Sequence, residues 1–145
     1  MTDAVKTPWH LWVVGGLSLL WNLFPAVDFT LTNMQNEFWL SQYNDAQRAF
    51  FLATPLWANI GWALGGFGSF AGSLLLLLRS RHAPTAFIVS AAGLAIVSYY
   101  QLVQNGDRMK QLLGDIPLYS TIIIWVVLLA LLFYARAMKA KGVLR

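Results

Sequence analysis

The chain has 145 residues, of which 58% are hydrophobic and 11% are charged, whereas a soluble domain carries roughly a quarter charged residues. The net charge of +4 comes from scattered Lys and Arg that flank apolar runs, which excludes a disordered chain and a nucleic-acid-binding patch. Cys is absent and the only histidines are His10 and His82, so disulfides, thiolate metal sites and most cofactors are excluded as well. We therefore expect an integral membrane protein that holds no cofactor or metal.

Four apolar stretches are long enough to cross roughly 30 Å of hydrocarbon as helices that rise 1.5 Å per residue. They cover residues 11–31, 55–78, 84–103 and 117–137. A soluble bundle would need polar helix faces to meet water, and the stretch 122–133 has none. The sequence therefore predicts an all-α integral membrane protein with a single domain, residues 1–145, in which four transmembrane helices form an antiparallel bundle.

The connection between the first two predicted spans is long enough to hold structure of its own. Asn44 and Gln47 have the spacing of a capping box, which predicts the start of a short helix that runs toward Pro55. Phe38 and Trp39 precede it, and aromatic rings of this kind are typical of the lipid headgroup region. We expect a short interfacial helix here. The segment that contains it either lies beside a ligand or is a membrane-surface connection that binds none.

The distribution of positive charge predicts the orientation of the bundle. Four spans place both termini on one side of the membrane, together with the short turn between the second and third spans. Seven of the ten Lys and Arg fall on that side, namely Lys6, Arg79, Arg81, Arg136, Lys139, Lys141 and Arg145. Because cytoplasmic loops carry the excess of Lys and Arg, we expect both termini in the cytoplasm.

Polar side chains within the predicted spans gather in the outer half of the membrane, and the inner half is almost purely apolar. A sugar needs amide and carboxylate partners for its hydroxyl groups and aromatic rings for its C–H faces. The predicted substrate-binding residues supply this mixture: Trp21, Asn22, Asp28, Trp57, Asn59, Trp62, Tyr100 and Gln101. The amides could equally hydrogen-bond between helices and hold the bundle together.

Two residues of the first span add to this hypothesis. Pro25 lies inside the span and frees a backbone carbonyl one turn earlier, near Trp21, as discontinuous transporter helices do. Asp28 is the one acid that could sit within the hydrocarbon. It is therefore the candidate for coupling proton movement, unless it lies in the wet interface.

Small residues recur every four positions along the second span, at Gly61, Gly65, Ser69 and Ser73, with Gly68 and Gly72 beside them. Small side chains let helix backbones approach closely and gain dispersion contacts. We therefore predict that this span is either the central helix of the bundle or the seam of a homodimer.

Several sequence segments carry a resemblance to a known family, and they cover most of the chain. These segments are residues 8–12 (PWHLW), 20–22 (LWN), 46–48 (AQR), 62–65 (WALG) and 72–81 (GSLLLLLRSR). The chain resembles a family of small four-span inner-membrane proteins of proteobacteria, whose members often carry the label "sugar transporter". The resemblance implies a multi-pass protein of the bacterial inner (cytoplasmic) membrane and a role in transport. It carries over no functional residue.

Two functional hypotheses remain. In the first, the chain is a small transporter or transporter subunit for an uncharged polar solute such as a sugar, working as a homodimer or a larger membrane assembly because four helices poorly enclose a path. In the second, it is a non-catalytic accessory or scaffold subunit of a larger membrane complex. An enzyme is not expected, because no catalytic triad, carboxylate pair or metal-ligand set lies at one depth in the membrane. For example, His10 is predicted near the inner face and Asp28 near the outer face.

Overall fold

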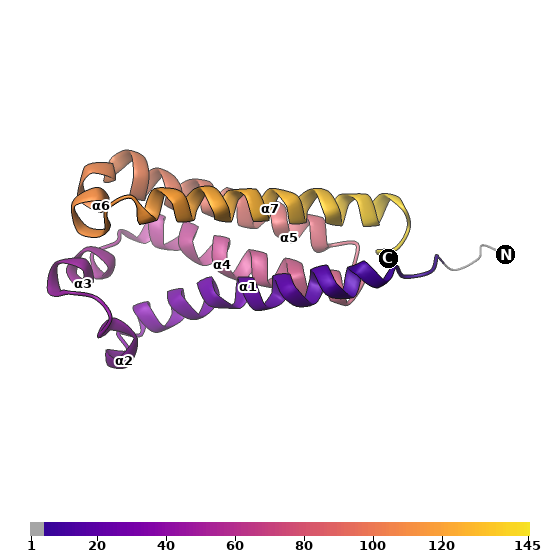
Figure 1. Ribbon diagram of the computed structural model, residues 1–145, viewed down its shortest axis with the longest axis horizontal. Helices are drawn as coiled ribbons and strands as arrows, with labels where there is room; N and C mark the ends of the chain where they lie inside the picture. The colour runs from indigo at the N-terminus through magenta and orange to yellow at the C-terminus, as the bar shows by residue number, and fades with distance from the viewer. Residues whose placement is uncertain (1–4) are drawn as a thin grey trace.

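The computed structural model describes residues 5–145, and four long helices dominate them (Figure 1). These are α1 (Trp9–Asn33), α4 (Leu56–Leu77), α5 (Ala83–Ser98) and α7 (Ile116–Ala140), and α5 continues as the π-helix η1 (Tyr99–Gln104). Each of the four apolar runs ends within three residues of its predicted limits, and each is long and apolar enough to cross a membrane. The prediction of a multi-pass, all-α membrane protein with four packed helices is confirmed.

The four long helices follow one another across the bundle in the order α1, α4, α5, α7 (Figure 1). α4 packs against α5 on one side and α1 on the other, and α7 packs mainly against α5. We call the end that holds Thr7, the α4–α5 turn and the C-terminal segment the terminal end, and the opposite end the loop end. α1 and α7 lie close together at the terminal end and diverge toward the loop end (Figure 1).

The small residues of α4 face both of its neighbours. An added Cβ at Gly61 would lie 3.0 Å from the Gly93 carbonyl oxygen of α5, whereas Ser73 hydrogen-bonds to Ser18 of α1 at 2.8 Å. The reason is helical geometry, because a four-residue step turns by about 40° more than a full revolution. Three such steps carry the small positions from the α5 side at Gly61 to the α1 side at Ser73. Within the chain, this stripe lets α4 occupy the centre of the bundle.

Polar contacts hold the terminal end together. The His10 Nδ1 atom of α1 and the Tyr134 hydroxyl of α7 share a hydrogen bond, which joins the first and last long helices. The backbone N–H of Arg145 donates to the Arg79 carbonyl at 2.8 Å, and the Arg81 N–H donates to the Arg145 carbonyl at 3.0 Å. Beneath these contacts Leu144 is almost fully buried. The bundle is therefore closed at this end.

Within residues 5–145, the loop end carries three short helices, α2 (Glu37–Leu40), α3 (Asp45–Leu52) and α6 (Gly106–Leu113). The predicted capping box is confirmed, since Gln47 N–H donates to Asn44 Oδ1 at 2.9 Å and Asn44 N–H donates to Gln47 Oε1 at 3.0 Å. The segment between α1 and α4 thus holds two short helices, where the sequence predicted one. α6 was not predicted at all.

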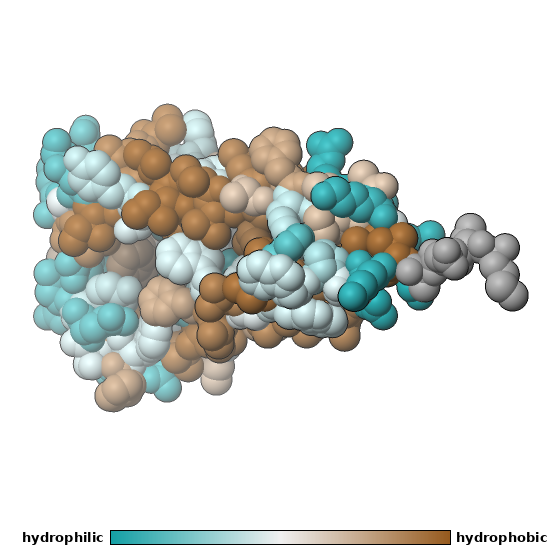
Figure 2. Space-filling model, turned by 45° about the vertical axis from the view of Figure 1, so that its right-hand side comes forward, coloured by the Kyte–Doolittle hydropathy of each residue, from teal (hydrophilic) through white to brown (hydrophobic). Residues whose placement is uncertain are grey.

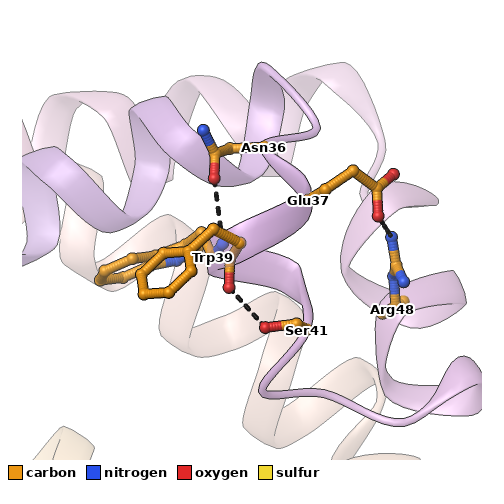
Figure 3. A network of polar contacts seen from close by, with 6 residues as sticks. Asn36, Glu37, Trp39, Ser41 and Arg48 are labelled. Atoms are coloured by element: carbon orange, nitrogen blue, oxygen red, sulfur yellow. Dashed lines mark hydrogen bonds and ion pairs between the residues drawn. The ribbon is translucent and has the colours of Figure 1, made fainter.

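A small group of polar contacts caps α2 and links it to α3 (Figure 3). The Trp39 N–H donates to Asn36 Oδ1 at 3.0 Å, which caps the first turn of α2. Arg48 of α3 forms an ion pair with Glu37 of α2 at 3.2 Å. The ion pair therefore links the two short helices at the loop end.

The surface divides into zones along the long axis. Figure 2 shows hydrophobic residues concentrated between the two ends of the bundle, with hydrophilic residues gathered at the ends themselves. α7 illustrates the apolar zone, because Ile122, Val126 and Phe133 all expose more than half of their surface. Large apolar side chains in such numbers are stable when lipid surrounds them.

Candidate functional site

A cavity of about 620 Å³ lies between α1 and α7, in the half of the bundle near the loop end. This volume falls within the range of about 300–1,000 Å³ that is typical of small-molecule sites. α1 and α7 form its walls, and α4 and α5 form its floor. Tyr43 and Phe51 reach it from the connection between α1 and α4. Each of the four long helices therefore contributes to one site.

The cavity exists because the floor carries small side chains where the walls diverge. Gly65, Gly66 and Ser69 of α4 and Ser90 of α5 line it, and their side chains are too small to fill the space between α1 and α7. An added Cβ at Gly66 would lie 3.2 Å from the Pro25 carbonyl oxygen, so α1 and α4 are already in close contact there. The small residues thus allow tight packing at the floor and leave the space above it open.

Among residues 5–145, Asp28 is the one acidic residue that lines the cavity. Its carboxylate accepts hydrogen bonds from Trp39 Nε1 of α2 at 2.8 Å and, more weakly, from the Thr32 hydroxyl at 3.4 Å. Within the described part of the chain the ion pairs are Arg48–Glu37 and Lys110–Asp115, so Asp28 has no cationic partner. Polar N–H and O–H groups therefore stabilise this carboxylate in place of a positive charge.

Tyr43 lines the cavity close to Asp28. Burial raises the pKa of the Tyr43 phenol above its ordinary value, and the negative charge of Asp28 raises it further. The hydroxyl is therefore neutral at physiological pH and can donate a hydrogen bond into the cavity.

Asn22 lies at the deeper end of the cavity and is 5% exposed. Its Nδ2 atom donates to the Ser73 hydroxyl at 2.8 Å and to the Ser69 carbonyl at 3.2 Å. Both partners belong to α4, so the amide group joins α1 to α4. In this structure the Asn22 side chain therefore serves helix packing as well as lining the cavity.

Gln101 of η1 and Ser120 and Thr121 of α7 line the cavity near the loop end. Their side chains form no hydrogen bond with another residue in the range 5–145. A glutamine amide offers two donors and one acceptor, and each hydroxyl offers both kinds of group. These three side chains are therefore available to a ligand.

Five of the eight predicted substrate-binding residues meet at this cavity: Trp21, Asn22, Asp28, Trp62 and Gln101. The other three lie elsewhere. Asn59 Nδ2 donates to Asn33 Oδ1 of α1 at 2.7 Å, outside the cavity. Trp57 packs edge-on against Tyr100, with ring centroids 5.6 Å apart, and Tyr100 stacks on Phe50 of α3. This aromatic cluster joins α4 and η1 to α3.

The cavity also has polar lining residues that the sequence did not assign to a site, which are Thr32, Tyr43, Ser90, Ser98, Ser120 and Thr121. Ser120 and Thr121 stand at the start of the fourth span, at the depth of Gln101, and this shared depth was the available signal. Ser98 accepts a hydrogen bond from Trp125 Nε1 at 3.3 Å, so part of its capacity serves packing. No group of three or more His, Asp or Glu that could hold a metal ion occurs among the described residues.

No family model matches this chain, and neither a curated protein nor a solved structure matches it. The resemblance to small four-span proteins of proteobacteria therefore stays a prediction. Any functional conclusion rests on the geometry and chemistry of the cavity.

Proposed function

We propose that the chain is a small membrane transporter, or a subunit of one, that binds an uncharged polar solute such as a sugar between α1 and α7. The observation that carries the proposal is the 620 Å³ cavity, which places hydrogen-bonding groups within the membrane-spanning part of the bundle. Polar groups are costly at that depth, so their gathering around one cavity favours a functional site.

The chemistry of the lining supports a hydroxylated solute. Gln101, Ser120 and Thr121 offer donors and acceptors that no described residue uses. Trp21 and Trp62 add aromatic planes against which the C–H face of a sugar ring can pack. Lys, Arg and His do not occur among the described lining residues, which disfavours an anionic solute.

The contacts that close the terminal end support a gate for the solute at that end of the bundle. Transport requires that the cavity open alternately to the two sides of the membrane. In this structure the His10–Tyr134 hydrogen bond joins α1 and α7 at the terminal end, while the two helices diverge at the loop end. We infer that passage of the solute requires α1 and α7 to separate at His10 and Tyr134.

We further propose that both termini are cytoplasmic and that the chain resides in the inner membrane of a bacterium. Seven of the ten Lys and Arg lie on the terminal side, as the positive-inside rule requires for this orientation. The cavity would then receive solute from the outer side. Since four helices leave it incompletely enclosed, we propose that the working form is a homodimer or a larger assembly.

The test is solute uptake into liposomes that contain the purified protein, measured with a panel of labelled neutral sugars and polyols. Gln101→Leu removes a cavity amide, and Gln104→Leu, three residues later and outside the cavity, is the matched control. We expect Gln101→Leu to lower uptake about tenfold, which corresponds to 1.4 kcal/mol of lost interaction, and Gln104→Leu to leave it unchanged.

Two outcomes would overturn this proposal. Equal uptake by the two glutamine variants would mean that the cavity is not the solute site. Absence of uptake for every solute, combined with a stoichiometric partner protein in mild detergent, would favour an accessory subunit of a larger membrane complex.

A further inference from the structure

The cavity has a side opening toward the surrounding membrane. Leu20 and Phe24 of α1 line it and are also 69% and 62% exposed, and Ile123 of α7 lines it and is 52% exposed. Side chains that face both the cavity and the outside mark a gap in the wall. Because these residues lie within the apolar helices α1 and α7, the gap opens at the depth of the hydrocarbon. We call it the lateral slot and define it by Leu20, Phe24, Ile123, Ile124 and Leu128.

The lining differs in polarity between the loop-end part of the cavity and the lateral slot. The polar groups deeper in the cavity, Asn22, Ser69 and Ser90, already form hydrogen bonds within the bundle. Toward the loop end it offers the Asp28 carboxylate, the Gln101 amide and the hydroxyls of Tyr43, Ser120 and Thr121. The lateral slot offers only hydrocarbon surface. A free sugar that filled the whole cavity would leave hydroxyl groups against this surface without hydrogen-bond partners, at a cost of about 1–3 kcal/mol each. An apolar chain in the slot carries no such cost.

We propose that the solute is an amphiphile, in which an uncharged hydroxylated headgroup occupies the loop-end part of the cavity and a single alkyl or acyl chain leaves through the lateral slot into the bilayer. The proposal rests on the function proposed above, because it assigns a substrate class to the same site. Such a molecule keeps its chain in an apolar environment throughout, since hydrocarbon surrounds it both in the bilayer and in the slot. Its headgroup exchanges water for the polar side chains of the loop end.

The charges around the cavity select against an anionic headgroup. Phosphate and sulfate groups are recognised by Arg and Lys, and the described lining contains neither. Asp28 adds a carboxylate that has no cationic partner among residues 5–145, and this group disfavours a negative headgroup and accepts hydrogen bonds from hydroxyl groups. An uncharged glycoside or a related polyol lipid fits these constraints.

The test is photolabelling of the protein in phosphatidylcholine nanodiscs with dodecyl glucoside that carries a diazirine in its chain. Sites of labelling are mapped by peptide mass spectrometry, and competition is measured with unlabelled dodecyl glucoside, methyl glucoside and dodecyl phosphate. Ile124→Trp fills the lateral slot, and Val126→Trp, on the exposed face of α7 outside the cavity, adds the same ring as a control. Both variants are checked for unchanged size-exclusion profiles and helix content.

We expect saturable labelling at the residues of the lateral slot, with competition by dodecyl glucoside and at least tenfold weaker competition by the other two molecules. Ile124→Trp should reduce labelling about tenfold, and Val126→Trp should leave it unchanged. Equal competition by methyl glucoside would overturn the proposal of an amphiphilic solute and leave the cavity as a site for a free sugar. Unsaturable labelling spread over the lipid-facing surface, unchanged in Ile124→Trp, would overturn the site itself.

Discussion

Replacement of Gly93 by alanine tests how closely α4 and α5 approach each other. A Cβ at this position of α5 would lie 2.5 Å from the Gly61 carbonyl oxygen and 2.5 Å from the Gly65 nitrogen, both of which are backbone atoms of α4. Ordinary contacts begin at 3.4 Å, so the helices would have to separate by almost 1 Å. No side-chain rotation can relieve this overlap, because the atoms that clash belong to helix backbones.

The expected cost is about 2 kcal/mol, within the range of 1–3 kcal/mol found when extra carbon atoms are forced into packed interiors. The matched control is Gly16→Ala in α1, because a Cβ there would meet no described atom within 4 Å apart from the adjoining backbone of its own helix. Both substitutions gain the same helix propensity of alanine over glycine. The difference between the two variants therefore isolates the cost of separating α4 from α5.

The measurement is reversible unfolding in mixed micelles with increasing dodecyl sulfate, followed by circular dichroism. We expect Gly93→Ala to be less stable than Gly16→Ala by about 2 kcal/mol, which is about a 30-fold change in the ratio of folded to unfolded protein. If the two variants unfold at the same dodecyl sulfate fraction, the close contact between α4 and α5 is refuted.

Three further substitutions test the contacts around the cavity in the same unfolding assay. Asn22→Leu should destabilise the protein by about 1 kcal/mol, because it removes the side-chain bonds from α1 to α4; no loss would show that these bonds do not hold the helices. Tyr134→Phe should cost about 1 kcal/mol through loss of the bond to His10, and a neutral result would contradict that link. Because the folded-state pKa of Tyr43 is raised by burial and by Asp28, its stabilising contribution is complete below pH 10 and is lost as the pH rises further. Wild type should therefore weaken above about pH 10 relative to Tyr43→Phe, and parallel pH profiles would contradict this.

The positions of the four long helices could be predicted because the bilayer imposes a length on any apolar run that crosses it. That requirement needs no knowledge of tertiary contacts. The capping box at Asn44 and Gln47 was equally accessible, because both hydrogen bonds join residues three apart in the sequence. Local rules were sufficient for these features.

The short helices at the loop end were harder to predict. α2 has four residues, and its start depends on a single side chain, Asn36, which accepts from the Trp39 N–H. α6 ends at Leu113, where the positive φ of 67° at the following Gly114 stops the helix, and Met109 is its buried residue. A glycine after a short amphipathic segment was the signal available in the sequence.

The candidate site shows that the depth of a residue in the membrane and the neighbour that its side chain faces are separate properties. Hydropathy along a span gives the depth of a residue, and Trp57, Asn59 and Trp62 were grouped on that basis. Which neighbour a residue faces depends on the rotation of the helix about its axis, and that rotation is set by packing. α4 turns Gly61 toward α5 and Ser73 toward α1, and with this rotation Trp62 faces the cavity whereas Trp57 faces Tyr100. Sequence alone offers no rule for that rotation.

The most direct measurement is the reactivity of single cysteines with a membrane-impermeant thiol reagent added from each side of the membrane. The chain contains no cysteine, so each variant carries one reactive group. Thr121 lines the cavity, and its neighbour Ile122 lies outside it on the exposed face of α7. Thiol reagents require a water-exposed thiolate. We predict that Thr121→Cys reacts from the loop side alone and that Ile122→Cys is inert. Equal reactivity of the two cysteines, or reaction of neither, would contradict a water-accessible cavity between α1 and α7.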